Sequence, residues 1–386
     1  MKLRSVLALT LAFFSLTACS TAEPVFSDVF VAKTDGFKSI RIPSVVVTQK
    51  GTLLAFAEAR AANSDQAQNK MALKRSSDSG QTWSAIQIIA DDGANSLNNP
   101  VAMVERKTGR VLLMYQRIPS HLKEHSKEVE TGFDGPNVYR NFLLTSDDDG
   151  VTWSKPLDIT SATKRATGAT TLAGGPGIAI QLEHGANKGR ILFPFNEGPY
   201  GMWNNYAVFS DDRGATWKCG ENVPNALVAN AKGVKKSQLN EVQVAELTDG
   251  SVLLNSRQFA GAKVRKKAIS HDGGVTWSAA EDVTELRDPS CMGSILRYSF
   301  AEKGSKNVLL YSGPDSLKRE NGTVYASLDD GATWPIKRVL RTDDFAYSVL
   351  TRLPNGDVGC LFEANNYARI VFARFPLEWV LEGGTK

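Results

Sequence analysis

The sequence is poor in the residues that cross-link small folds or hold metal ions. Its 386 residues include 4 cysteines and 4 histidines, and no Cys-x-x-Cys pair occurs, so we expect no disulfide framework. A chain of this length buries enough surface to fold without a disulfide or metal staple. His121 and His125 stand four residues apart, but their segment lacks the Glu-first zinc motif and a third ligand. We interpret it as a solvated polar segment.

The sequence also lacks an excess of charge of one sign and any long apolar run after its N-terminus. It has 45 basic and 41 acidic residues and no Lys/Arg-dense segment, so nothing in it indicates a nucleic-acid partner. The missing apolar runs exclude a protein with several membrane spans. No Walker sequence or Gly-x-Ser-x-Gly elbow occurs, which leaves phosphate binding and that kind of serine nucleophile without support.

What the N-terminus does contain is an export pattern. Lys2 and Arg4 precede an apolar run, residues 6–16, that is too short to span a membrane. We therefore expect residues 1–18 to be a signal peptide. Any association with a membrane would then come from a lipid anchor alone.

The end of this signal, Leu16-Thr17-Ala18-Cys19, resembles a bacterial lipobox, in which the cysteine is lipidated and becomes the new N-terminus. We expect a lipidated Cys19, a short linker over residues 19–30, and an exported lipoprotein in the periplasm or at the cell surface. Secretion after cleavage near Ala18 is the alternative. The other cysteines, Cys219, Cys291 and Cys360, are odd in number, and we interpret them as buried small side chains.

Five octapeptides repeat the pattern Ser-x-Asp-x-Gly-x-Thr-Trp, with starts 70, 64, 60 and 57 residues apart. In this pattern Asp accepts backbone hydrogen bonds in a tight turn, Gly supplies a positive φ, and Trp buries a large surface. We expect these aspartates to be structural, because they occur five times whereas an active site is single. The five boxes are Ser76–Trp83, Ser146–Trp153, Ser210–Trp217, Ser270–Trp277 and Ser327–Trp334.

Short strand-like runs and turns surround the boxes, and a weak helical periodicity occurs only near residues 121–130, so the sequence predicts an all-β fold. The mean interval of about 63 residues divides the mature chain into about six units of propeller-blade size. We predict a single domain over residues 31–386, a six-bladed β-propeller of four-stranded antiparallel blades. Five blades carry a box, and the two ends of the chain together form the sixth.

The boxes resemble the Asp boxes of the sialidase, or neuraminidase, family. Such boxes also occur in propellers of other function, so they support the fold and not the activity. An independent set of motifs extends the resemblance, in family order, over residues 36–380. These motifs are Arg41-Ile42-Pro43, Glu58-Ala59-Arg60, Asp65, the segment from Glu241 to Arg257, Arg319, Tyr347-Ser348-Val349-Leu350 and Leu361-Phe362-Glu363.

The resemblance implies a bacterial exo-α-sialidase, a glycoside hydrolase that removes terminal α-linked sialic acids from glycoproteins, glycolipids and oligosaccharides with retention. Its mechanism requires no cofactor or metal. Sialic acid bears a carboxylate on its anomeric carbon, and guanidinium groups hold carboxylates through paired planar hydrogen bonds. Arg41, Arg257 and Arg319 are the residues that the resemblance assigns to this task.

The substrate's carboxylate also constrains the nucleophile. An anionic nucleophile about 4 Å away would be repelled by about 4 kcal/mol at an effective dielectric near 20, whereas a neutral phenol avoids this repulsion. The resemblance makes Tyr347 the nucleophile, forming a sialyl-tyrosine intermediate. Glu241 is its base and Asp65, in a polar loop, is the acid/base that serves the leaving oxygen and then water.

Three further residues receive supporting roles from the resemblance. Glu363 orients Arg41 through a carboxylate–guanidinium pair, and Arg60 contacts the other side of the sugar. Asn99 stands where several relatives have Asp, so contacts to the 4-hydroxyl and N-acyl region depart from the family pattern.

Two other functions stay open. A trans-sialidase, or an intramolecular one that forms an anhydro product, uses the same catalytic residues, and acceptor-site aromatic residues such as Tyr200 and Trp203 would decide between them. A non-catalytic glycan-binding propeller is disfavoured because anion binding needs only the arginines, whereas Asp65, Glu241 and Tyr347 are all present.

Overall fold

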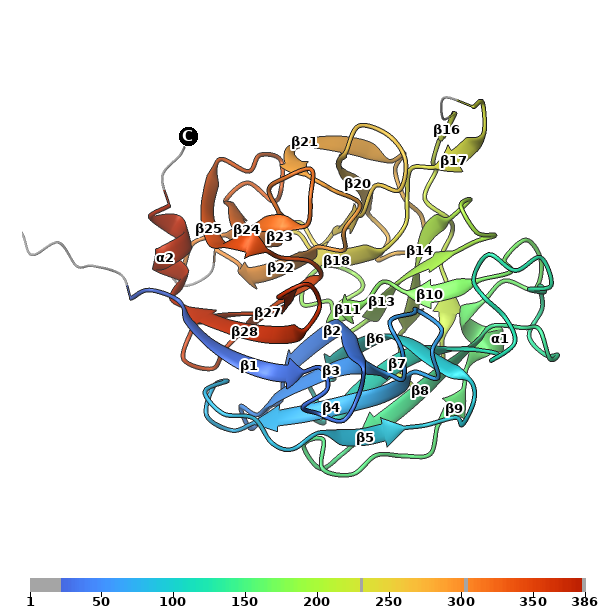
Figure 1. Ribbon diagram of the computed structural model, residues 1–386. Helices are drawn as coiled ribbons and strands as arrows, with labels where there is room; N and C mark the ends of the chain where they lie inside the picture. The colour runs from blue at the N-terminus through green and yellow to red at the C-terminus, as the bar shows by residue number, and fades with distance from the viewer. Residues whose placement is uncertain (1–21, 230–231, 302–304, 384–386) are drawn as a thin grey trace, which may run out of the picture.

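The computed structural model describes residues 22–229, 232–301 and 305–383. In these ranges six sheets surround a common axis (Figure 1), which confirms the predicted six-bladed β-propeller. The described residues include only two short helices, α1 (Thr160–Thr163) and α2 (Leu377–Leu381). Neither of them is long and apolar enough to cross a membrane. The expected signal peptide and Cys19 lie outside the described residues.

Each blade is built around four antiparallel strands, and the first strand of a blade lies nearest the axis. In blades 1, 2, 5 and 6 this strand contacts the first strands of both neighbouring blades. Blades 1 to 3 are β2 (Ser39–Val47), β3 (Leu53–Arg60), β4 (Lys70–Ser76), β5 (Gln87–Ala90); β6 (Ser96–Val104), β7 (Val111–Ile118), β8 (Arg140–Ser146), β9 (Leu157–Asp158); and β10 (Leu172–Gly174), β13 (Ile191–Glu197), β14 (Asn204–Ser210), β15 (Lys218–Cys219). Blades 4 and 5 are β18 (Val242–Glu246), β19 (Val252–Ser256), β20 (Val264–Ser270), β21 (Glu281–Arg287); and β22 (Ser294–Ser299), β23 (Val308–Pro314), β24 (Glu320–Ser327), β25 (Ile336–Asp344).

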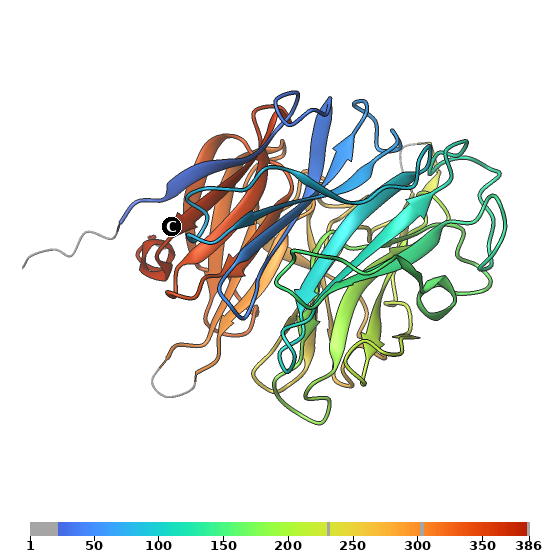
Figure 2. The same cartoon turned by 90° about the horizontal axis from the view of Figure 1, so that it is seen from below.

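The ring closes in blade 6, where both ends of the chain meet (Figure 2). Its strands β26 (Ser348–Arg352), β27 (Val358–Ala364) and β28 (Arg369–Phe375) come from the C-terminal part, and β1 (Val25–Val31) pairs with β28 as the outer strand. This is the box-free blade that the sequence predicted. Residues 25–30 therefore belong to the propeller, and the expected linker over residues 19–30 extends too far. Its strand was missed because β1 lacks strict alternation and its partner lies at the far end of the chain.

Three short additions complete the strands. β11 (Gly177–Ile178) pairs in parallel with β6, and β12 (Ile180–Gln181) pairs with β13. Outside the blades, β16 (Leu227–Ala229) and β17 (Lys235–Ser237) form a two-stranded hairpin.

The five boxes are the turns between the third and fourth strands of blades 1 to 5. In the third box, Asp212 accepts hydrogen bonds from the Thr216 N–H at 2.8 Å and the Thr216 hydroxyl at 2.6 Å. The Gly214 N–H donates to the Ser210 hydroxyl at 2.7 Å, and that hydroxyl donates to Asp212. The hydrogen bonds of the Asp212 carboxylate are thus made within the turn itself, as expected for a structural aspartate.

Candidate active site

A cavity of about 250 Å³, open to solvent, lies among the inner strands and the loops that precede or follow them. The structure brings the residues singled out in the sequence to this one place from blades 1, 2, 4, 5 and 6. The predicted site residues in its wall are Arg41, Arg60, Asp65, Asn99, Glu241, Arg257, Arg319 and Tyr347. Glu363 stands behind Arg41.

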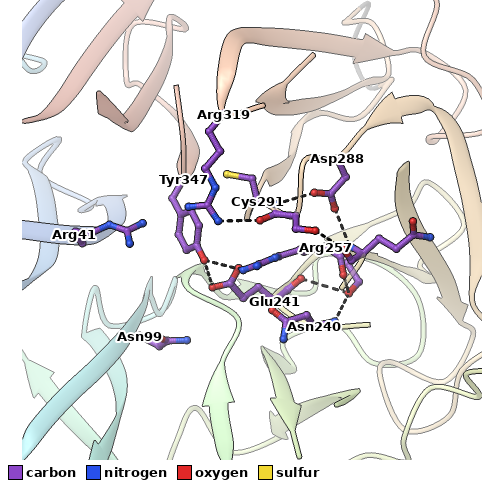
Figure 3. Close-up of polar contacts among 12 residues, drawn as sticks. Arg41, Asn99, Asn240, Glu241, Arg257, Asp288, Cys291, Arg319 and Tyr347 are labelled. Carbon is purple, nitrogen blue, oxygen red and sulfur yellow. Dashed lines mark hydrogen bonds and ion pairs between the residues drawn. The ribbon is translucent and has the colours of Figure 1, made fainter. Parts of the chain in front are cut away.

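At the centre of the cavity, Tyr347, Glu241 and Arg257 form a triangle of hydrogen bonds (Figure 3). Tyr347 Oη donates to Glu241 Oε1 at 2.5 Å, and Arg257 Nη1 donates to Glu241 Oε2 at 2.6 Å and to Tyr347 Oη at 2.9 Å. Burial, and then the Glu241 carboxylate, raise the pKa of Tyr347 well above 10, although the nearby arginines act in the opposite direction. The phenol is therefore neutral at physiological pH and has a hydrogen-bonded base in place.

Arg41 owes its orientation to a bulge in β2. The pairing of β2 with β3 shifts between Arg41 and Ser44, and Ile42, which precedes Pro43, has a φ of 60°, an unfavourable value for a β-branched residue. Glu363 holds this bulge because its Oε1 accepts the Ile42 N–H at 2.9 Å. The same carboxylate accepts Arg41 Nε at 3.0 Å and Nη2 at 2.8 Å, a paired contact of the kind predicted.

Arg319 reaches the cavity from the loop that precedes β24. Its Nη2 donates to the Ser290 carbonyl at 2.9 Å and its Nη1 to Tyr367 Oη at 3.2 Å. The guanidinium carbon lies 5.2 Å from the centre of the Tyr347 ring. Tyr367 also stacks under Arg41 at 4.2 Å, a role that no motif in the sequence indicated.

The three arginines thus surround Tyr347, with Arg41 5.3 Å from its ring centre. Arg257 has one hydrogen-bond donor that is not used: its Nε is buried and has no hydrogen-bond partner among the described residues. A buried donor without an acceptor is costly in a folded protein, and an anionic ligand would satisfy it.

Asp65 lies on the predicted loop, which joins β3 to β4, and 69% of its side chain is exposed. Arg60 Nη1 donates to Asp65 Oδ1 at 2.8 Å. Partial burial opposes ionisation of Asp65, but the charge of Arg60, aided by those of Arg41 and Arg319, outweighs it and lowers the pKa. Before substrate binds, Asp65 is therefore held in its ionised form.

A residue without an assigned role, Glu58, organises this side of the cavity. It is fully buried, and its carboxylate accepts Arg60 Nε at 2.8 Å, Asn69 Nδ2 at 3.2 Å and the Asn99 N–H at 2.8 Å. Asn69 Nδ2 in turn donates to the Asp65 carbonyl at 2.7 Å. Glu58 was visible in the sequence as part of the Glu-Ala-Arg motif, but its contacts required the fold.

Asn99 is placed by a second bulge, before Pro100 in β6, and has a φ of 53°. Its side-chain amide donates to the Gly174 carbonyl at 3.1 Å. Asn tolerates this backbone region better than most residues. Asn99 therefore lies in the cavity wall with one side-chain donor already engaged.

Glu124 is the functional candidate that sequence reasoning missed. Its segment is not a helix but a turn-rich loop, in which His121 bonds to Asn137 at 2.8 Å and His125 packs on Tyr200. Burial, and then the carboxylates of Glu241 and Asp65, raise the pKa of Glu124 to about 7, although a hydrogen bond from Trp203 opposes this. The weak helical periodicity of this segment indicated no cavity residue, and the structure has no helix there.

The part of the cavity wall formed by blades 2 and 3 contains unsatisfied polar groups. Within the described residues, three buried atoms of this part of the wall have no hydrogen-bond partner: Asn98 Oδ1, Tyr139 Oη and Thr171 Oγ1. Buried polar atoms are normally paired, so this wall suits a ligand rich in hydroxyl and amide groups.

Tyr200 and Trp203 both line the cavity but differ in exposure. Trp203 is buried, whereas Tyr200 is 44% exposed. The Tyr200 ring packs edge-on against Trp203 at 5.0 Å, and Lys236 Nζ lies 5.8 Å from its centre. An exposed ring held in this way is a flat surface at the edge of the site.

Comparison with known proteins gives these features a context. Residues 49–360 match the family model of the BNR repeat-like domain. Sialidase-2 of Cricetulus griseus is 31% identical over 376 residues, which cover 89% of this chain and 93% of that protein. The sialidase of Micromonospora viridifaciens is 33% identical over 379 residues and 93% of this chain, and the chain spans 55% of that relative's length. Among solved structures, the Hadza microbial sialidase Hz136 matches with a TM-score of 0.80 at 29% identity, covering 92% of this chain and 69% of that one.

Proposed function

The chain belongs to the sialidase family of BNR-repeat propellers, and from that membership we propose that it is an exo-α-sialidase. It hydrolyses terminal α-linked sialic acids from glycans, with retention, through a sialyl-tyrosine intermediate. The observation that carries this proposal is the Tyr347–Glu241 hydrogen bond of 2.5 Å among three arginines. A protein that only binds an anionic sugar has no use for a base on a buried phenol.

Substrate binding uses the cationic side of the cavity. Arg41, Arg257 and Arg319 hold the carboxylate, and the free Nε of Arg257 gains its missing acceptor. The unsatisfied atoms of Asn98, Tyr139 and Thr171 face the neutral, hydroxyl-rich part of the sugar. This division between a charged and a polar wall matches a nine-carbon acidic sugar.

In the first step, Tyr347 Oη attacks the anomeric carbon as its proton passes to Glu241. The bond from that carbon to the glycosidic oxygen breaks, and Asp65 supplies the proton that the leaving oxygen takes. In the second step Asp65 accepts a proton from water, the water oxygen attacks the anomeric carbon, and Tyr347 leaves with the proton that Glu241 returns. Two inversions at one carbon give net retention.

A second candidate, transfer of the sugar to an acceptor or to its own hydroxyl, is favoured by one observation. The exposed Tyr200 ring, fixed against the buried Trp203, offers an apolar face at the cavity edge on which an acceptor sugar could stack. Transfer would use the same intermediate, with the acceptor hydroxyl in place of water.

Turnover of a fluorogenic α-sialoside, followed by proton NMR of the products, tests both candidates. Free sialic acid that first forms as the α-anomer supports retaining hydrolysis, and the β-anomer first contradicts it. An anhydro sugar or a sialylated acceptor selects transfer. No turnover of any linkage between pH 4 and 8 refutes the enzyme and leaves a glycan-binding propeller.

We further propose, from the lipobox pattern alone, that the protein is exported and lipidated at Cys19, a residue outside the described part of the chain. Radiolabelled fatty acid should enter the wild type expressed in a bacterium and not a Cys19→Ala variant. Equal labelling of both, or of neither, contradicts the anchor.

A further inference from the structure

A buried ion pair beside the arginine trio has no part in the proposed mechanism. Arg265 and Asp288 are both fully shielded from solvent, and Arg265 Nη1 donates to Asp288 Oδ2 at 3.1 Å. Arg265 also donates to Asn255 Oδ1 at 2.8 Å. Buried pairs of this kind bring little net stability relative to apolar residues of the same size. The residues that contact the Arg265–Asp288 pair indicate another reason for its presence.

Asp288 contacts the main chain that carries Arg257. Its Oδ2 accepts the N–H of Gln258, the next residue after Arg257, at 2.7 Å. On the other side, the Arg257 N–H donates to the Glu241 carbonyl at 2.7 Å. The backbone that bears Arg257 is thus fixed from both sides where it leaves β19.

The same carboxylate shapes the loop that holds Arg319. Asp288 Oδ1 accepts the Cys291 N–H at 2.8 Å, and Arg265 Nη1 donates to the Cys291 carbonyl at 2.8 Å. Between these contacts Ser290 has a φ of 61°, a strained value for serine that persists only when its surroundings hold it. The Ser290 carbonyl is the acceptor of Arg319 Nη2. In Figure 3, Cys291 lies beside Arg319, and Asp288 joins it to the chain after Arg257.

We propose that Asp288 is a positioning residue that sets the spacing of Arg257 and Arg319, and through it the selectivity of the site for a carboxylate-bearing sugar. One buried side chain contacts both the backbone that follows Arg257 and the loop whose Ser290 carbonyl accepts a hydrogen bond from the Arg319 guanidinium. Paired hydrogen bonds to a carboxylate tolerate little displacement, and an error of about 1 Å in a site can cost about 10²-fold in rate. The inference rests on the proposed function, in which the arginines bind the substrate's carboxylate.

The chain offers a matched control at the other end of the same blades. Arg297 Nη2 donates to Asp330 Oδ1 at 2.6 Å, and Asp330 Oδ2 accepts the Thr248 N–H at 3.1 Å. This Asp–Arg pair joins blade 4 to blade 5, but Thr248 follows β18, whereas Glu241 precedes it. Neither Arg297 nor Asp330 lines the active-site cavity.

The test compares Asp288→Asn with Asp330→Asn on a fluorogenic sialoside and on its methyl ester, which lacks the negative charge. We expect Asp288→Asn to lower kcat/KM for the free acid by about 10²-fold and to reduce the preference for acid over ester at least tenfold. Asp330→Asn should also lower the melting temperature but keep the wild-type preference. A folded Asp288→Asn enzyme with the wild-type preference, or an equal loss of preference in Asp330→Asn, overturns the proposal.

Two results, an inactive wild type and an Asp288→Asn variant that does not fold, must be distinguished from a failure of the positioning role. If the wild type turns over neither substrate, the proposed function fails and the positioning role falls with it. If Asp288→Asn does not fold, Arg265→Lys provides the same measurement, because lysine keeps the charge but cannot serve Asp288, Cys291 and Asn255 at once. Its preference for the acid should fall about tenfold, and an unchanged preference in the folded variant overturns the proposal.

Discussion

Tyr347 and Glu241 share a 2.5 Å hydrogen bond although they stand 106 positions apart. Each is the residue immediately before the inner strand of its blade, Tyr347 before β26 and Glu241 before β18. In a propeller these equivalent positions lie around one end of the axis. The phenol and its base therefore meet because two blades present the same position to a shared centre.

Replacement of Tyr347 by Phe tests the nucleophile. The ring stays, and with it the contacts to Arg41 at 5.3 Å and Arg319 at 5.2 Å, but the attacking oxygen is lost. We expect kcat to fall on the order of 10³-fold or more, while the affinity for free sialic acid, measured by calorimetry, changes only a few-fold. Tyr325→Phe, a buried tyrosine of β24 outside the cavity, should be as active as the wild type. Wild-type turnover in Tyr347→Phe would remove this residue from the mechanism.

Glu363→Gln should weaken substrate binding more than turnover. The change removes the charge that holds Arg41 through two hydrogen bonds and supports the Ile42 bulge. Charge-assisted hydrogen bonds of this kind contribute about 1.5–3 kcal/mol, so we expect KM to rise roughly 10- to 100-fold. Glu183→Gln, which breaks an exposed pair with Arg106, is the control and should leave KM unchanged. A larger effect on kcat than on KM would contradict the orienting role.

The pH profile should respond to Arg60. Its positive charge favours ionised Asp65 and so lowers the pKa of that carboxyl, whereas the first step needs Asp65 protonated. A Glu58→Gln/Arg60→Gln double variant leaves no lone buried charge and raises the Asp65 pKa. The alkaline limb of kcat/KM for a sialyl-oligosaccharide should then move to higher pH, while Glu58→Gln with Arg60→Lys, which keeps a cation near Asp65, should move it less. A shift to lower pH in the double variant is the opposite of what this electrostatic account requires.

Tyr200 should matter for the sugar next to sialic acid. Tyr200→Ala removes the exposed ring, and an aromatic contact is worth about 0.5–1.5 kcal/mol, so KM for sialyllactose should rise roughly 3- to 10-fold. KM for methyl α-sialoside, which has no second sugar, should change little. Tyr200→Phe keeps the ring and serves as the control. An equal effect on both substrates would place Tyr200 outside an acceptor site.

The box aspartates predict a pH-dependent contribution to stability. Hydrogen bonds, chiefly from the box threonine, lower the pKa of Asp78, Asp148 and Asp212 from 3.8 to about 2. A carboxyl whose pKa is lower in the folded than in the unfolded state stabilises the fold at pH values above its unfolded pKa. This stabilisation is lost as the pH falls through the folded-state pKa. Compared with an Asp78→Asn/Asp148→Asn/Asp212→Asn variant in urea unfolding, the wild type's advantage should be full above about pH 5 and shrink toward pH 2. An advantage independent of pH would mean that the carboxylate charge has no part in the turn.

The sequence by itself determined the blade count and the layout of the chain. Each box closes through hydrogen bonds within eight residues, as from Thr216 to Asp212, so the turn is encoded locally and its repeat can be counted. The motifs carrying Arg41, Glu241 and Tyr347 were also legible as short patterns around single residues. Even closure of the ring by the two chain ends followed from the one unit without a box.

The tertiary structure alone decided which groups face one another and what their environment does to them. β1 pairs with β28 although they lie at opposite ends of the chain. Glu58 accepts hydrogen bonds from Arg60 of blade 1 and Asn99 of blade 2. Asp288 joins the backbone after Arg257 to the loop that accepts a hydrogen bond from Arg319. The pKa of Glu124, which burial and the carboxylates of Glu241 and Asp65 raise, is another such property. Such properties depend on distances and burial that exist only once the ring is closed, because desolvation and contacts between blades leave no trace in local sequence.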